Sequence, residues 1–164
     1  MNSIYKPISY IQEELDLRIL IPDRLIEKMR KMVTKHFPNE FGGIFVGYYS
    51  DNKKEAKIED VLWPNQFINS PQTFIRVPND INAALKRMYN ESNGRLIYLG
   101  EWHSHPLGPD SFSILDFEAI KSIAQDKKIK IDLPLLCICF CHREKNNFRF
   151  YVYHENQLFN FEKE

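Results

Sequence analysis

The sequence predicts an α+β fold, an α/β sandwich in which a mixed central β-sheet is flanked by three helices. Three segments repeat apolar residues at the spacing of an amphipathic helix. They alternate with short runs rich in Val, Ile, Phe and Tyr, which is the composition of strands. One late run, residues 133–142, is apolar almost without interruption, as is typical of a strand covered on both faces.

The helices and strands follow one another along the whole chain. The first helix is expected over residues 22–37, where Pro22 marks its start and apolar residues recur at helical spacing. The second opens at Pro78 and closes at Gly94, and the third spans residues 114–128. The strands are expected at residues 42–50, 56–64, 73–77, 95–105, 133–142, 148–155 and 157–161.

A single domain over residues 17–164 is expected, preceded by an N-terminal extension, residues 1–16, in which the pattern is weakest. Asn146 and Asn147 are predicted to turn the chain between two late strands. No apolar stretch reaches the roughly 20 residues that span a bilayer, and the N-terminus lacks the pattern of a secretory signal. We therefore expect a cytoplasmic protein with no membrane partner.

The charge balance argues against a nucleic-acid partner. Lys and Arg number 22, Asp and Glu number 22, and the formal net charge is zero. Proteins that bind nucleic acids usually carry a basic excess, because phosphate contacts supply much of their affinity. Short basic runs such as Lys127 and Lys128 are therefore interpreted as solvated helix faces.

The cysteines are interpreted as core residues. Cys137, Cys139 and Cys141 alternate along one apolar run, so their side chains should face the same way on a strand. Such neighbours seldom have disulfide geometry, and an odd count suits free thiols in a reducing compartment. A second metal site that combines them with His142 and His154 is the weaker alternative.

Two histidines and an aspartate form a candidate metal site. His103 and His105 end a predicted strand and are two positions apart, so both imidazoles should point to the same side. Asp116 follows after a loop rich in proline and glycine, which can bring its carboxylate to the same point. Two histidines and one carboxylate leave a position open for water, the arrangement of a catalytic zinc site. One interpretation of this pattern is therefore a single bound Zn²⁺.

The same segment also has a purely structural interpretation. Ser113 and Asp116, three residues apart before an apolar helical run, have the form of a helix capping box with Asp in place of Glu. In that case no metal is involved. Both interpretations can hold together, because a capped first turn would also fix the position of the Asp116 carboxylate.

A hydrolytic zinc site needs a base for its water, and Glu40 is the preferred candidate. It lies at the mouth of the first central strand, before two glycines that let neighbouring chain approach closely. The alternative for a lone glutamate there is a solvated loop residue. Glu101 is the rival because it adjoins the histidines, but we expect it to face the opposite surface of the sheet from His103.

These residues together resemble a known signature. Glu40 with "GGIFVG", followed by His103-x-His105, seven residues and Ser113-x-x-Asp116, resembles the JAMM motif of the JAB1/MPN/Mov34 metalloproteases. The resemblance implies the MPN/JAMM fold, which is cytidine-deaminase-like, and one zinc ion bound by the two histidines and the aspartate. It also implies that Glu40 moves the proton and that Ser113 donates a hydrogen bond to the oxyanion during hydrolysis of an amide or isopeptide bond.

The segment "YLGEWHSHP" is similar to a compact prokaryotic JAB subgroup found in anti-phage operons, including the CBASS type. This similarity implies E1- and E2-like partners and a deconjugating or processing activity. The implied substrate is a ubiquitin-like protein or a conjugated nucleotidyltransferase, with an extended C-terminal tail that adds as a strand beside the sheet. The segment before the second helix is the expected edge. Phe112 departs from the commoner prokaryotic form, which has proline before the serine.

Two other functions stay open from the sequence. A catalytically silent MPN scaffold would only bind its partner, and such members tend to lack the ligands that this chain keeps. The RadC-type proteins linked to DNA repair share His-x-His-Pro followed by Asp, but the neutral charge balance argues against a role on DNA.

Overall fold

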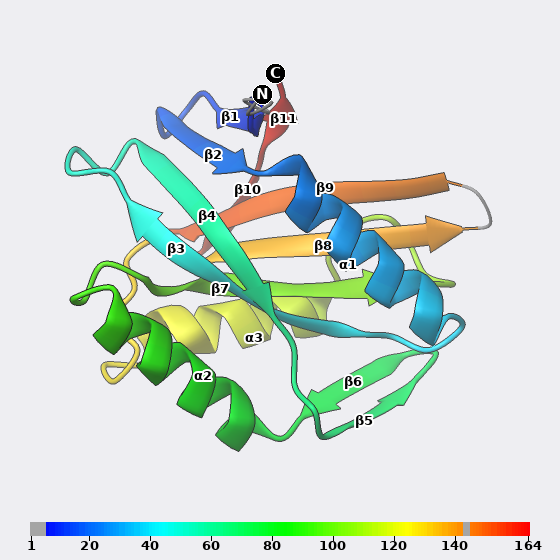
Figure 1. Cartoon of the computed structure of the whole chain (residues 1–164). Coiled ribbons are helices and arrows are strands. Elements are labelled where there is room, and N and C mark those ends of the chain that lie inside the picture. Colours follow the sequence, from blue (N-terminus) through cyan, green and yellow to red (C-terminus); the bar gives the residue numbers. More distant parts are fainter. Residues whose placement is uncertain (1–5, 143–144) are drawn as a thin grey trace, which may run out of the picture.

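The computed structural model describes residues 6–142 and 145–164 and confirms the α+β class (Figure 1). Within this part of the chain, three helices accompany a nine-stranded sheet and a separate two-stranded hairpin. The helices are α1 (Asp23–His36), α2 (Pro78–Glu91) and α3 (Ile114–Gln125). The strands are β1 (Ile8–Gln12), β2 (Leu17–Ile21), β3 (Gly42–Tyr49), β4 (Glu55–Leu62), β5 (Phe67–Ser70), β6 (Thr73–Arg76), β7 (Ile97–His105), β8 (Leu135–His142), β9 (Lys145–His154), β10 (Gln157–Asn160) and β11 (Glu162–Lys163).

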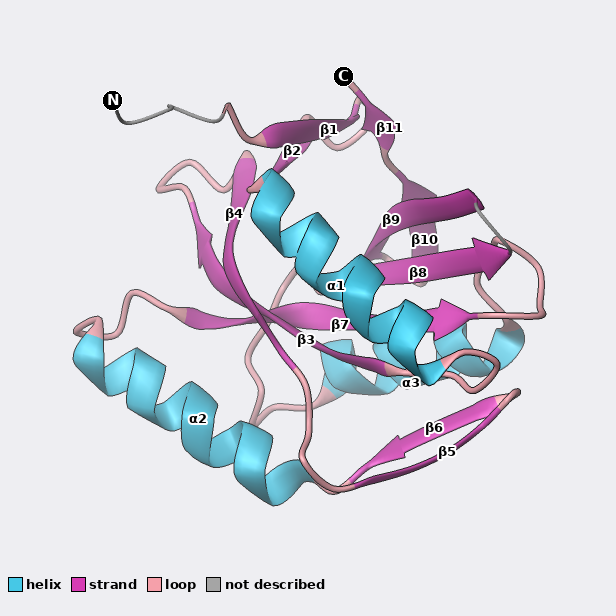
Figure 2. Cartoon of the chain, turned by 45° about the vertical axis from the view of Figure 1, so that its right-hand side comes forward, coloured by secondary structure: helices cyan, strands magenta, loops and turns pink. Residues whose placement is uncertain are grey.

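The sheet separates two layers of helices (Figure 2). Its strand order is β10-β9-β8-β7-β3-β4-β2-β1-β11, and it is mixed because β7 and β8, and likewise β2 and β4, run parallel. Helix α1 packs on one face, where Leu25 and Met29 join the largest apolar cluster. On the other face, Ile120 of α3 packs against β8 and β9, and Ile81 of α2 packs against β3.

Strand β8 is buried on both faces, as its apolar run predicts. Cys137, Cys139 and Cys141 are free, buried thiols in the cluster beneath α1. Leu136 and Ile138 point the other way, into the cluster beneath α3. The interpretation of the cysteines as core residues is therefore confirmed. The second metal site is not found among the described residues, and the side chain of its proposed member His142 lies outside them.

The last segment of the chain joins the two edges of the sheet. Strand β10 pairs with β9, whereas β11 pairs with β1 at the opposite edge. Between them, Phe161 is buried and donates its backbone N–H to the Phe150 carbonyl at 2.9 Å. The ring of Tyr10 in β1 lies 4.6 Å from that of Phe150. Part of the expected N-terminal extension, residues 1–16, thus contributes a strand to the sheet.

Two local predictions differ from the structure. The turn predicted at Asn146 and Asn147 is wrong, because these residues lie in β9 opposite Cys141 and Phe140. Pairing with a buried strand outweighs the turn preference of asparagine. Strands β1, β2, β5 and β11 were not expected. Strand β5, which forms a hairpin with β6, contains Asn69 and Ser70, whose residue types prefer turns.

Gly42 allows β3 to approach the histidine-bearing strand closely. It lies opposite His103, and a Cβ atom added to it would lie 2.3 Å from the Trp102 carbonyl oxygen and 2.7 Å from the His103 Cβ. Real Cβ atoms do not approach backbone this closely. Any larger residue would therefore push β3 and β7 apart beside the candidate site.

The variant Gly42→Ala tests this close approach. We expect it to lower the free energy of unfolding by about 2–4 kcal/mol, because the strand pair must separate. The measurement is urea unfolding of the metal-free protein. Gly108→Ala is the matched control, because its Cβ would meet only His105 atoms at 3.6 Å and beyond. Equal losses in the two variants would contradict the steric explanation.

Candidate metal centre

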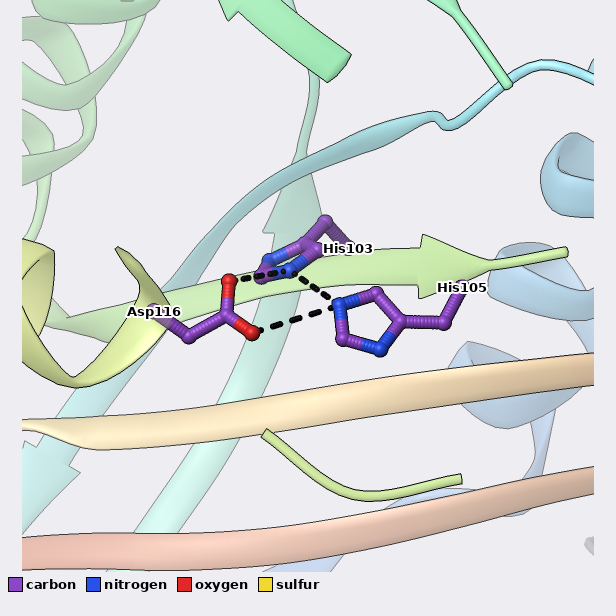
Figure 3. Close-up of side chains that lie close together, drawn as sticks. All are labelled: His103, His105 and Asp116. Carbon is purple, nitrogen blue, oxygen red and sulfur yellow. Dashed lines mark hydrogen bonds and ion pairs between the residues drawn. The ribbon is translucent and has the colours of Figure 1, made fainter. Parts of the chain in front are cut away.

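Three side chains from two elements converge on one point (Figure 3). The potential ligand atoms of His103, His105 and Asp116 all lie within 4.8 Å of one another. These three side chains are called the metal group below. The two Nε2 atoms are 3.1 Å apart. Oδ1 of Asp116 lies 2.8 Å from His103 Nε2, and Oδ2 lies 3.3 Å from His105 Nε2. No other group of this kind occurs among the described residues.

Strand geometry positions the two imidazoles. Because successive side chains alternate along β7, residues two apart point to the same face. The strand is paired on both sides, with His103 opposite Gly42 of β3 and Ile138 of β8. The ring of His105 is oriented further, since its Nδ1 lies 3.1 Å from the Pro109 carbonyl oxygen. When Nδ1 donates its proton to that oxygen, the Nε2 lone pair remains for a metal.

A capped helix positions the carboxylate. Ser113 is the N-cap of α3: its hydroxyl accepts from the Asp116 N–H at 3.2 Å, and Asp116 Oδ2 accepts from the Ser113 N–H at 2.6 Å. The predicted capping box is therefore confirmed, and it coexists with the metal group because Oδ1 faces His103. Phe112, the departure from the commoner pattern, packs its ring edge-on against Tyr151 at 5.1 Å and so anchors this turn.

The charges of the group favour a cation. Burial raises the pKa of Asp116, but hydrogen bonds with His103 and His105 outweigh it and hold that pKa well below its usual range. Burial lowers the pKa of His105, but the hydrogen bond and charge of Asp116 outweigh it and the net shift is upward. The carboxylate is thus anionic. Two imidazole nitrogens and one carboxylate oxygen form the donor set of a catalytic zinc site, so these residues fit a zinc ion.

All five residues singled out from the sequence line one cavity of about 840 Å³. Besides the three above, these are Glu40 and Ser113. Burial raises the pKa of Glu40; the charges of His103 and His105 oppose this, and that of Asp116 adds to it. Glu40 therefore interacts electrostatically with the metal group, although Glu40 and these residues are far apart in the sequence.

Glu101 also lines this cavity, so the expectation that it faces away from His103 is wrong. The two residues are two positions apart, and strand alternation places them on the same face. The Glu101 carboxylate, however, already has hydrogen-bond and ion-pair partners. Arg76 forms a two-point ion pair with it, in which Nη2 and Oε1 are 2.7 Å apart, and the Tyr98 hydroxyl donates to Oε1 at 2.8 Å. Glu101 is therefore a poorer base than Glu40.

The cavity is a groove between the hairpin strand β6 and helix α3. Its walls are mostly apolar, and they include Phe74, Ile75, Leu115, Ala119 and Ile123. Strand β6 pairs only with β5 among the described strands, so its other edge has no strand partner there. The groove thus offers an extended peptide both an apolar surface and backbone groups.

Two residues next to this site could not be predicted, because no sequence motif singles them out. Ser104 lies between the two histidines and is buried, with its hydroxyl accepting from the Phe41 N–H at 3.0 Å. Asn69 of β5 donates its side-chain amide to the Glu40 carbonyl at 2.9 Å. Both contacts join distant parts of the chain, which local patterns do not reveal.

Comparison with known proteins shows the same fold and several relatives. Residues 22–153 match the family of prokaryotic homologs of the JAB domain. A CD-NTase/cGAS isopeptidase of Enterobacter hormaechei is 31% identical over 134 residues, which cover 81% of this chain and 73% of that protein. A probable metalloprotease of Sinorhizobium fredii is 25% identical over 131 residues, 78% of each chain. The solution structure of protein DSY2949 from Desulfitobacterium hafniense, 21% identical, covers 87% of this chain and 86% of its own with a TM-score of 0.60.

Zinc binding tests the metal group directly. We expect one zinc ion per chain, and its loss in Asp116→Ala, because only two imidazoles then remain. Zinc at about 100 times its dissociation constant should stabilise the wild type by about 2.7 kcal/mol and the variant far less. Elemental analysis and thermal unfolding with and without zinc measure both effects. Glu118→Ala removes an exposed acid from the same helix and should keep the ion. Equal zinc content in both variants would place the ion elsewhere.

Proposed function

Because the chain belongs to the family of prokaryotic homologs of the JAB domain, we propose that it is a zinc-dependent isopeptidase or peptidase. The proposed reaction is hydrolysis of the amide bond at the C-terminus of a ubiquitin-like or otherwise conjugated protein. The observation that carries the proposal is the convergence of His103, His105 and Asp116 in a groove that also contains Glu40. The relatives named isopeptidase and probable metalloprotease support the same class of reaction.

The proposed roles follow from the positions of the side chains. His103, His105 and Asp116 would hold the ion. A bound zinc ion supplies Lewis-acid chemistry, lowering the pKa of water and polarising a carbonyl. Glu40 would accept a proton from the attacking water and pass it to the leaving amine. Ser113 would donate its hydroxyl to the carbonyl oxygen as negative charge develops there. That hydroxyl now donates to Asp116 Oδ2 at 2.8 Å, so it must exchange this acceptor for the substrate oxygen.

The groove between β6 and α3 is the proposed binding site for the substrate tail. An extended tail could pair with the edge of β6 that no described strand occupies, so that main-chain hydrogen bonds provide affinity. The apolar wall formed by Leu115, Ala119 and Ile123 would then select the side chains that face α3. The carboxyl end of the tail would lie at the metal group.

The proposed biological setting is an anti-phage operon of the CBASS or ubiquitin-like type. The name of the relative, CD-NTase/cGAS isopeptidase, supports a conjugated nucleotidyltransferase as one proposed substrate. E1- and E2-like proteins are proposed as partners only from the resemblance of "YLGEWHSHP" to the prokaryotic JAB subgroup. None of the helices in the described residues is long and apolar enough to cross a membrane. A cytoplasmic location is proposed because its reducing conditions suit three free, buried thiols.

Glu40→Gln tests the proton-transfer role. We expect the rate of amide hydrolysis to fall by about 10²–10⁴-fold, because the amide side chain cannot accept the proton. Zinc content should stay unchanged. The assay uses a fluorogenic amide at the C-terminus of a ubiquitin-like protein, with and without a zinc chelator, and Glu118→Gln as the control. Cleavage that survives the chelator, or full activity in Glu40→Gln, would contradict the proposal. Zinc binding without cleavage of any conjugate would favour a binding scaffold.

Ala119→Trp tests the groove. The indole would fill the space between α3 and β6, so we expect the KM for a substrate with an extended tail to rise at least about tenfold while zinc content is unchanged. Glu118→Trp places the same side chain on the exposed neighbouring position and should leave KM as in the wild type. Equal KM values for the two variants would show that the tail binds elsewhere.

A further inference from the structure

Glu40 lies in irregular chain between α1 and β3, yet its backbone is fully engaged. Neither Glu40 nor Phe41 belongs to a helix or strand. Irregular segments are usually the more mobile parts of a fold, and a base must be held at a defined distance from the bond it acts on. All four backbone polar groups of these two residues nevertheless have a hydrogen-bond partner within the protein.

The hairpin provides two of the four partners. The Glu40 N–H donates to the Ser70 carbonyl at 2.8 Å, and the Asn69 side-chain amide donates to the Glu40 carbonyl at 2.9 Å. Asn69 itself lies opposite Phe74 in the hairpin, and the Phe74 ring is 5.5 Å from that of Phe41. The hairpin is thus attached to this segment by hydrogen bonds and by ring packing.

The histidine-bearing strand provides the other two partners. The Phe41 N–H donates to Ser104 Oγ at 3.0 Å, and the Ser104 N–H donates to the Phe41 carbonyl at 2.8 Å. Ser104 is 1% exposed, so this contact is shielded from water. Because Ser104 stands between His103 and His105, the segment that carries Glu40 is tied to the residues that carry the metal group.

We propose that Asn69 and Ser104 are positioning residues that hold Glu40 at a fixed position relative to the metal group. This inference rests on the function proposed above. Asn69 ties Glu40 to the hairpin that forms one wall of the substrate groove, and Ser104 ties the adjacent Phe41 to β7. Two of the four bonds use side-chain atoms, so they depend on these residue types and can be removed one at a time. Neither residue contacts the reacting atoms.

Asn69→Asp is the sharpest test, because it keeps the size of the side chain while it replaces the donor with an acceptor and adds one negative charge. We expect kcat to fall about tenfold or more, with KM and zinc content unchanged, since small displacements of a catalytic group are costly. In the metal-free protein, hydrogen exchange of the Glu40 amide should accelerate about tenfold. Asn82→Asp, an exposed position on α2, introduces the same charge and should change neither quantity.

Combination with Glu40→Gln shows whether the effect passes through Glu40. If Asn69 acts only by positioning this residue, Asn69→Asp should not slow the Glu40→Gln enzyme further. Ser104→Ala is the second variant; it should accelerate exchange of the Phe41 amide and lower kcat without changing KM. Urea unfolding curves identify whether Asn69→Asp or Ser104→Ala has lost its fold. If one has, the hydrogen-exchange data of the other variant test whether that residue positions Glu40.

Two results would overturn the inference. One is an unchanged Glu40 exchange rate in Asn69→Asp. The other is an equal loss of kcat when Asn69→Asp is introduced into the wild type and into Glu40→Gln. Failure of the proposed function has a different signature, namely no chelator-sensitive cleavage by the wild type or full activity in Glu40→Gln. The exchange measurements would still test the positioning contacts in that case.

Discussion

Strand β7 is fixed on both sides by its neighbours, and the candidate site depends on this constraint. Pairing with β3 and β8 sets its register, and alternation along it then directs His103 and His105 to one side. The absence of a side chain at Gly42 lets β3 lie close against this strand. Because Ser104 of the same strand also binds the backbone of Phe41, next to Glu40, one strand positions the two imidazoles and the chain beside Glu40.

Helix capping and metal binding are often alternative explanations for a polar residue at the start of a helix, but the geometry of Asp116 is compatible with both. Its Oδ2 closes the first turn of α3 with Ser113, while Oδ1 faces His103. The structural interaction therefore supplies the rigidity that a ligand needs. A partly buried carboxylate of this kind is tolerated because hydrogen-bond donors surround it.

The parts of the fold with their own periodicity could be predicted from the sequence: the three helices, the central strands and the cap at Ser113. Strands β5 and β11 could not, because β5 contains the turn-preferring residues Asn69 and Ser70 and β11 has only two residues. Asn146 was misassigned because local preference yielded to pairing with a central strand. The spacing of His103, His105 and Asp116 allowed both a metal site and a capping box, and the resemblance to the JAMM motif favoured the metal site. In contrast, the contacts of Asn69 and Ser104 join residues 29 and 63 positions apart, which no local pattern encodes.

The junction of β10 and β11 also bears on self-association. A sheet with two unpaired outer strands can template the addition of another copy, which leads to fibres or precipitates. Here the outermost strands are successive parts of one segment, separated only by Phe161. Strand β10 has four residues and β11 has two, so each offers only a short edge to an incoming chain. On the function proposed above, a foreign strand would pair with the hairpin beside the groove, so the fold would direct where a guest peptide docks.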